Sequence, residues 1–464
     1  MNQPPGGAIN FLALSEVWTR PIASQQRPKD IPAWAAQSLI ALGVLGVLFI
    51  AFDLLISPTF LAYDSMQDYA HVWFINDQIF HHASLPLRIA VLDSGHAATF
   101  PYGLVPYIAG AFLFELFGNW SMVLMMTTAM LGTIWAVTLV RPEMRNPWLL
   151  LLFLMNPFFI DSTYAFQFPT VWTFLFFFLF VWAFEHRRHV LAAVLMWLTV
   201  STHPVIGGVT VAGYVVAIAL FDRERLRALA MLSIPVSVAL LPVAWMSLST
   251  PSVQENSLTD VILAALRALP RRETIVLAPF ALSALAPIVL RNYRVFLLGS
   301  TLSLAAGLIA ATSTLAPWAD GSYYGAIHTS RDIYASFFAS PQFHPGQVYR
   351  VMEPNDREDG MYYFIQHGAV LGNEFFTEST YRINWSASSY QCFVAFKHID
   401  YVSIESAYQA AFGTNEQALL ESLVASGEAS VTYTDPGGAF KIYNMRPFAG
   451  EQPPPASLGQ CAIQ

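Results

Sequence analysis

The stretch that decides the fold of this chain is Ser57–Gly118, SPTFLAYDSMQDYAHVWFINDQIFHHASLPLRIAVLDSGHAATFPYGLVPYIAGAFLFELFG. It is polar and rich in carboxylates and histidines, and the long apolar runs on either side of it carry few charges. A loop of this kind at a membrane surface is a suitable place for chemistry on a lipid-borne substrate. The stretch therefore predicts a polytopic membrane protein whose first outer loop carries the function.

The composition of the whole chain supports this class. Only 12% of the 464 residues are charged and 55% are hydrophobic, whereas soluble domains carry about 25% charged residues. The net charge of −8 gives no reason to expect a nucleic acid partner. The two cysteines, Cys392 and Cys461, are too few for a disulfide framework and lack the spacing of a zinc site. One bridge in an extracytoplasmic domain and two free thiols both stay open.

Apolar runs divide the chain into spans. Residues 1–32 form a polar, Pro-rich cytoplasmic tail, and residues 33–316 form a transmembrane domain whose first outer loop is 57–120. Several runs are shorter than the about 20 residues that a span normally needs. The nine runs are Ala33–Ile56, Ser121–Val140, Pro147–Ile160, Pro169–Phe184, Val190–Thr202, Val205–Phe221, Leu229–Leu248, Thr274–Leu290 and Val295–Leu315.

Arginine clusters between the runs predict the topology, because positive residues favour the cytoplasmic side. With nine spans and a cytoplasmic N-terminus, all four clusters fall inside, provided that Tyr102–Phe117 lies at the outer surface rather than crossing. The C-terminal region is then extracytoplasmic, in a multi-pass plasma (inner) membrane protein. The clusters are Arg141/Arg145, Arg187/Arg188, Arg223/Arg225/Arg227 and Arg291/Arg294.

The composition changes at Pro317, where long apolar runs stop. Residues 317–447 are predicted to form an extracytoplasmic α/β domain, followed by a disordered tail over 448–464. The predicted elements are a helix over Arg331–Ala339, strands over Gln347–Met352 and Tyr362–Gln366, one long strand or a strand pair over Phe393–Ile404, a helix over Gln409–Ala425, and a hairpin of Ala429–Tyr433 with Ala439–Asn444.

Asp64 and Asp68 are the candidate catalytic residues. They lie four positions apart, on one face if Tyr63–Phe80 is helical. A carboxylate at the membrane edge can deprotonate an acceptor hydroxyl or hold a divalent cation on a phosphate. Two solvated aspartates in a loop are the ordinary alternative. The loop also carries His71 and Arg88, but its histidines lack the HExxH spacing of a zinc site.

Further candidates come from other outer segments. Asp161 opens the second outer loop, where it either shares a metal or a substrate with Asp64 or caps a helix. His203, in STHPV at the outer end of a span, either donates to a phosphate or satisfies itself at headgroup level. Arg271 and Arg272 are, with Arg88, the outer cations suited to a donor phosphate, and headgroup anchors are the alternative.

This layout resembles the GT-C superfamily of polytopic glycosyltransferases, which includes protein O-mannosyltransferases and aminoarabinose transferases. The stretch FPYGLVPYIAGAFLFELFG is similar to the Tyr/Lys-Pro-Pro-Leu helix of that class, with PYGLVP replacing the adjacent prolines. The resemblance implies Asp64 as the catalytic carboxylate of the first loop, Asp68 as its substitute and Asp161 as an acidic residue of the second loop. The adjacent Asp-Glu pair of several members is absent, which leaves dependence on Mg²⁺ or Mn²⁺ open.

The expected function is therefore transfer of a sugar from a polyprenyl-phosphate donor to a hydroxyl of a glycan, lipid or protein acceptor on the extracytoplasmic face. Two alternatives belong to other classes. A transporter or flippase of a lipid-linked saccharide would use the same cavity without cleaving a bond, and it would tend to place ionisable residues near the middle of the membrane. A non-catalytic membrane scaffold would use the outer domain to bind a partner.

Overall fold

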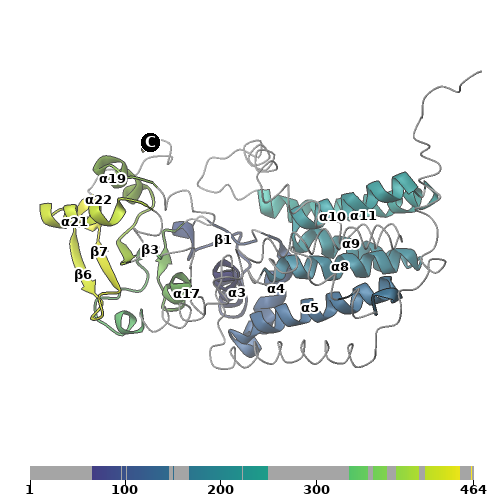
Figure 1. Cartoon of the computed structure of the whole chain (residues 1–464), viewed down its shortest axis with the longest axis horizontal. Coiled ribbons are helices and arrows are strands. Elements are labelled where there is room, and N and C mark those ends of the chain that lie inside the picture. Colours follow the sequence, from purple (N-terminus) through teal and green to yellow (C-terminus); the bar gives the residue numbers. More distant parts are fainter. Residues whose placement is uncertain are drawn as a thin grey trace, which may run out of the picture.

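The computed structural model describes residues 65–95, 97–100, 102–145, 150, 167–221, 223–248, 334–353, 359–373, 383–406, 413–449 and 461. The predicted spans Ala33–Ile56, Thr274–Leu290 and Val295–Leu315 lie outside these residues, as does Pro147–Ile160 except at position 150. The described residues form a helix bundle, a short middle segment and an α/β sheet, which follow one another along the long axis (Figure 1).

Five helices form the bundle, and each coincides with a predicted apolar run. They are α5 (Trp120–Val140), α8 (Phe168–Glu185), α9 (His189–Thr202), α10 (Pro204–Phe221) and α11 (Arg223–Leu248). Three stretches are long and apolar enough to cross a membrane, Trp120–Val140, Phe168–Glu185 and Leu226–Trp245, while His189–Thr202 and Pro204–Val216 are shorter. The described residues thus include three helices that could cross a membrane, but they do not show nine spans.

The outward faces of these helices are apolar. Trp135 of α5, Val209 of α10 and Trp245 of α11 are more than half exposed, like several aliphatic side chains beside them. Exposed apolar surface on this scale marks a site of protein or membrane contact. A bundle with polar residues largely confined to its ends and interior is suited to a lipid environment.

Helices α5 and α8 run in the same direction. The indole Nε1 of Trp172 donates to the carbonyl oxygen of Met125 at 2.9 Å near their starts. At their other ends, the guanidinium of Arg141, which follows α5, donates to both carboxylate oxygens of Glu185, the last residue of α8, at 2.9 Å. This largely buried ion pair lies at the far end of the bundle from the sheet (Figure 1).

The middle segment lies between the bundle and the sheet (Figure 1). It contains α3 (Ser65–Phe80), a hairpin of β1 (Arg88–Ile89) with β2 (Ala97–Ala98), the short turn η2 (Asp93–Gly95) and α4 (Leu104–Phe117). Helix α4 ends at Phe117, and the Gly118 that follows has a φ of 55°, which favours glycine. Helix α4 is therefore separate from α5. Its 14 residues span about 21 Å, less than the about 30 Å hydrocarbon core, as expected for a helix that does not cross.

The C-terminal region is an α/β sheet, as predicted. Its five strands are ordered β4-β3-β5-β7-β6. Strands β4, β3 and β5 are parallel, and β7 is antiparallel to both of its neighbours, β5 and β6. The strands are β3 (Val348–Met352), β4 (Val370–Leu371), β5 (Tyr401–Glu405), β6 (Ser430–Thr434) and β7 (Phe440–Asn444). The helices are α17 (Asp359–Gln366), α19 (Ala387–Phe396), α21 (Glu416–Ser426) and α22 (Arg446–Ala449).

Two predicted elements of this region were wrong. Tyr362–Gln366 was expected as a strand but belongs to α17, and Phe393–Ile404 begins in α19 and reaches a strand only at Tyr401. Both helices are crossovers between parallel strands, which a tight turn cannot connect. The aromatic residues that favoured strands instead form the buried faces of these helices.

Packing joins the middle segment to the sheet. The Lys397 ammonium lies 2.5 Å from a carboxylate oxygen of Asp93, and both side chains are largely buried. The Ser94 hydroxyl donates to the backbone oxygen of Lys397 at 2.6 Å, and the Leu371 amide of edge strand β4 donates to the Val91 oxygen at 2.9 Å. One hydrophobic core continues through α3, α4, the start of α5 and the sheet.

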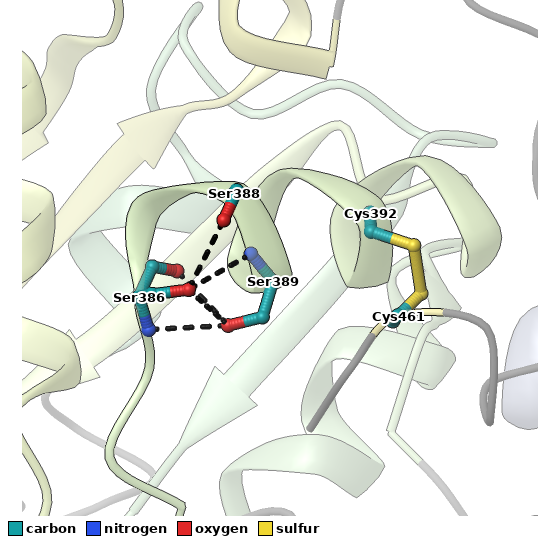
Figure 2. Close-up of a disulfide and its surroundings, with 5 residues drawn as sticks. All are labelled: Ser386, Ser388, Ser389, Cys392 and Cys461. Atoms are coloured by element: carbon teal, nitrogen blue, oxygen red, sulfur yellow. Dashed lines mark hydrogen bonds between the residues drawn. A yellow bond between two sulfur atoms is a disulfide. The ribbon is translucent and has the colours of Figure 1, made fainter. Parts of the chain in front are cut away.

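A disulfide joins Cys392 of α19 to Cys461, 69 positions later in the chain (Figure 2). This answers the question that the sequence left open. Within the predicted tail, Phe448 is buried in α22 and Cys461 is buried at the bridge, so both positions are held to the domain. Ser386 caps the N-terminus of α19 with its hydroxyl, which accepts from the Ser389 amide at 3.2 Å (Figure 2).

Candidate functional site

A buried polar stripe lies on α3. Gln67, Asp68 and His71 have spacings that place them on one side of the helix, and all three are nearly or fully buried. The Tyr107 hydroxyl of α4 donates to a carboxylate oxygen of Asp68 at 2.7 Å. A buried carboxylate needs such donors to offset its lost hydration. This contact joins α3 to α4.

The imidazole of His71 is held by a hydrogen bond and a ring contact. Its Nδ1 lies 2.6 Å from the Gln67 carbonyl oxygen, which can only accept, so Nδ1 carries the proton. The imidazole stacks on the Tyr107 ring with centroids 5.2 Å apart. Tyr107 of α4 therefore contacts both Asp68 and His71 of α3.

A second pair forms at the start of α4. The Tyr102 ring lies 5.0 Å from the imidazole of His203, which follows the last residue of α9. Gly103 packs so closely on the end of α9 that a Cβ there would lie 2.1 Å from the Ser201 carbonyl oxygen. Burial lowers the pKa of His203 from 6.5 to about 4, so the imidazole is neutral at physiological pH.

The Asp68–Tyr107 and Tyr102–His203 contacts define the candidate site. Tyr102 and Tyr107 both come from the PYGLVPY turn, and Tyr107 also packs edge-on against Phe168 at the start of α8. The site therefore lies where α3, the starts of α4 and α8 and the α9–α10 joint converge. It is the end of the bundle that faces the sheet, opposite the Arg141–Glu185 ion pair.

The structure brings three of the predicted site residues to this place: Asp68, His71 and His203. Arg88 lies elsewhere in the middle segment, half-buried on β1. Asp64, Asp161, Arg271 and Arg272 lie outside the described residues, so the predicted metal pair Asp64 and Asp161 does too. Within the described part of the chain, no group of three or more His, Cys, Asp or Glu side chains has the arrangement of a metal site.

Burial limits the role that Asp68 can have. Asp68 has no exposed surface, so an acceptor hydroxyl has no access to its carboxylate in this arrangement. Its bond to Tyr107 instead holds α3 against α4. Asp64 lies four positions before Asp68 in the sequence and outside the described residues.

Sequence reasoning missed the tyrosines. Tyr102 and Tyr107 stand inside the quoted proline-containing stretch, but hydroxyl and ring contacts with another helix leave no periodic signal. The prolines in PYGLVPY were a local indication that the chain turns there.

A comparison with known protein families and with curated proteins found no match to this chain.

Proposed function

We propose that this protein is an integral membrane glycosyltransferase of the GT-C type. It would transfer a sugar from a polyprenyl-phosphate donor to an acceptor hydroxyl on the extracytoplasmic face. The observation that carries the proposal is the Asp68–Tyr107 contact at the sheet-facing end of the bundle. It anchors the start of α3, and with it the acidic first loop, at the place where a lipid-borne donor and a soluble acceptor can meet.

The chemistry needs a base and a phosphate site. The acceptor oxygen attacks the anomeric carbon, the bond from that carbon to the phosphate oxygen breaks, and polyprenyl phosphate leaves with the electron pair. Asp64 takes the acceptor proton, while Asp68 is a positioning residue. Arg88, Arg271 and Arg272 are assigned to the donor phosphate because guanidinium groups match its geometry. Asp161 is assigned to a substrate contact, while the buried His203 is a positioning residue for the start of α4.

Two independent features support the proposed orientation. The Cys392–Cys461 disulfide is typical of an oxidising, extracytoplasmic compartment. Arg141, Arg145, Arg187 and Arg188 follow the ends of α5 and α8 that lie away from the sheet, and Arg223 begins α11 about 27 Å along α10 from His203. The positive-inside rule places that end in the cytoplasm.

Transfer of radiolabelled sugar in membranes tests the function. The Asp64→Asn variant keeps the side-chain shape and removes the base, so transfer should fall about 10²- to 10⁴-fold. The Asp68→Asn variant still accepts from Tyr107, so its transfer should fall less than about tenfold, as in Tyr107→Phe. Both aspartate variants should insert and elute like the wild type.

Three other outcomes contradict the proposal in different ways. Full activity in Asp64→Asn beside an inactive Asp68→Asn would move the base by one turn. Full activity in the double variant would remove this loop from the chemistry. Label that crosses the membrane but stays on its lipid would identify a flippase, the alternative class.

A further inference from the structure

The C-terminal sheet domain contacts the helix that carries Asp68. Tyr362 of α17 is fully buried, and its ring centroid lies 5.3 Å from that of Tyr69 on α3. Tyr69 follows Asp68 directly, so the two side chains project from adjacent positions of one helix. A shift of α17 would therefore act on α3 at the level of the Asp68–Tyr107 contact.

The Tyr362 hydroxyl makes the shorter of two hydrogen bonds that connect α17 to the bundle, and the other runs from Gln366 Nε2 to the same Asn119 oxygen at 3.4 Å. The Tyr362 hydroxyl donates to the side-chain oxygen of Asn119 at 2.7 Å, and Gln366 Nε2 donates to the Tyr362 oxygen at 2.9 Å. Asn119 stands between α4 and α5, directly before the first residue of α5. Burial raises the pKa of Tyr362 well above 10, so the hydroxyl keeps its proton and stays a donor.

Other contacts hold the same two parts together without Tyr362. The Asp93–Lys397 ion pair and the Ser94 hydrogen bond attach the sheet to the turn η2, which follows the β1 strand. Loss of the Tyr362 hydroxyl therefore leaves the sheet attached to the middle segment. Its effect should be confined to α3 and the α4–α5 joint.

We propose that Tyr362 is a positioning residue of the sheet domain for the candidate site. Its hydroxyl bond to Asn119 holds the Tyr362 ring in place against Tyr69. One residue thus connects α3 to the α4–α5 joint, and loss of the hydroxyl loosens this connection. Together these contacts keep α3 and α4 at the separation that the Asp68–Tyr107 bond requires. The catalytic consequence rests on the proposed function, while the restraint on α3 is independent of it.

Hydrogen exchange measured by mass spectrometry on the protein in nanodiscs tests the restraint. In Tyr362→Phe, the amides of α3 should exchange about 3- to 10-fold faster, because a buried hydrogen bond across the joint is lost. The amides of β3 and β5 should be unchanged. Adding Asn119→Ala also removes the longer Gln366–Asn119 hydrogen bond of 3.4 Å, so the added change should be smaller than that caused by Tyr362→Phe alone.

Tyr443→Phe is the matched control. Tyr443 is a fully buried tyrosine of β7, and its hydroxyl has no hydrogen-bond partner among the described residues. Its removal should leave exchange in α3 at the wild-type rate. Equal α3 exchange in Tyr362→Phe and wild type, or equally fast exchange in both variants, would overturn the proposal.

Kinetics distinguish positioning from substrate binding. For sugar transfer, Tyr362→Phe should lower kcat about tenfold and leave the KM of the donor unchanged, since Tyr362 acts through α3. A raised donor KM with unchanged kcat would overturn the positioning role. If the wild-type protein transfers no sugar, the proposed function fails, and the exchange experiment still decides whether Tyr362 restrains α3.

Discussion

His203 occupies a joint where the ends of three helices meet. Its ring contacts Tyr102, and its backbone connects α9 directly to α10. Because burial holds its pKa at about 4, below the 6.5 of an unfolded chain, the unfolded state binds more protons between these two values. Stability conferred by the neutral imidazole is complete above pH 6.5 and is lost as the pH falls toward 4.

The residue-scale prediction is a pH-dependent melting temperature. The pKa difference between the two states corresponds to a loss of about 2 kcal/mol of unfolding free energy at pH 5 relative to pH 7.5. Thermal unfolding in detergent, measured at both pH values, should show this loss in the wild type and much less of it in His203→Asn. His82→Asn, a change at an exposed histidine, should keep the wild-type difference. Equal pH dependence in all three proteins would rule out His203 as the source.

At the scale of elements, the start of α4 is the tightest contact in the candidate site. Gly103 has an extended backbone, so its φ is open to any residue, and the requirement is for space. A Cβ would lie 2.1 Å from the Ser201 oxygen and 2.6 Å from the Thr202 oxygen. Both atoms belong to the backbone and cannot rotate away. An added methyl group must therefore push α4 away from the end of α9.

Gly103→Ala should lower the free energy of unfolding by about 1–3 kcal/mol, the usual cost of overpacking. The melting temperature in detergent should fall accordingly. Gly208→Ala is the matched change, because Gly208 lies in nearby α10 and a Cβ there would meet nothing within 4 Å. That variant should be unchanged or slightly more stable, since alanine favours a helix. A Gly103→Ala protein as stable as wild type would show that α4 moves without cost.

Hydropathy predicted the bundle helices well because each apolar run needs a helix in lipid, whatever its neighbours are. The local sequence predicted a strand where α17 forms, because the helix is required by the parallel arrangement of β3 and β4, which the local sequence does not reveal. For the candidate site, the sequence identified Asp68, His71 and His203 as unusual ionisable residues near apolar runs. It did not predict the buried Tyr107 contact or the Tyr362–Asn119 bond, whose partners are 39 and 243 positions apart.

At the scale of the whole molecule, the two ends differ chemically. One end carries the disulfide domain and the other the arginine clusters of α5, α8 and α11. Both described cysteines are in the disulfide, so an introduced thiol can be labelled selectively. In intact cells, Ser388→Cys on α19 should react with an impermeant maleimide, because its position is exposed on the sheet domain. His186→Cys, in the exposed turn after α8, should react only after permeabilisation. The reverse pattern would invert the proposed topology.

The Asp93–Lys397 ion pair joins residues 304 positions apart. At a translation rate of about 5–20 residues per second, roughly 15–60 s pass between synthesis of the two partners. During that time the sheet-facing surface of α3 and the Asp93 turn lack the sheet that covers them in the folded protein. In the proposed topology, the nascent chain exposes this surface outside the bilayer, where chaperones of the extracytoplasmic compartment would meet it.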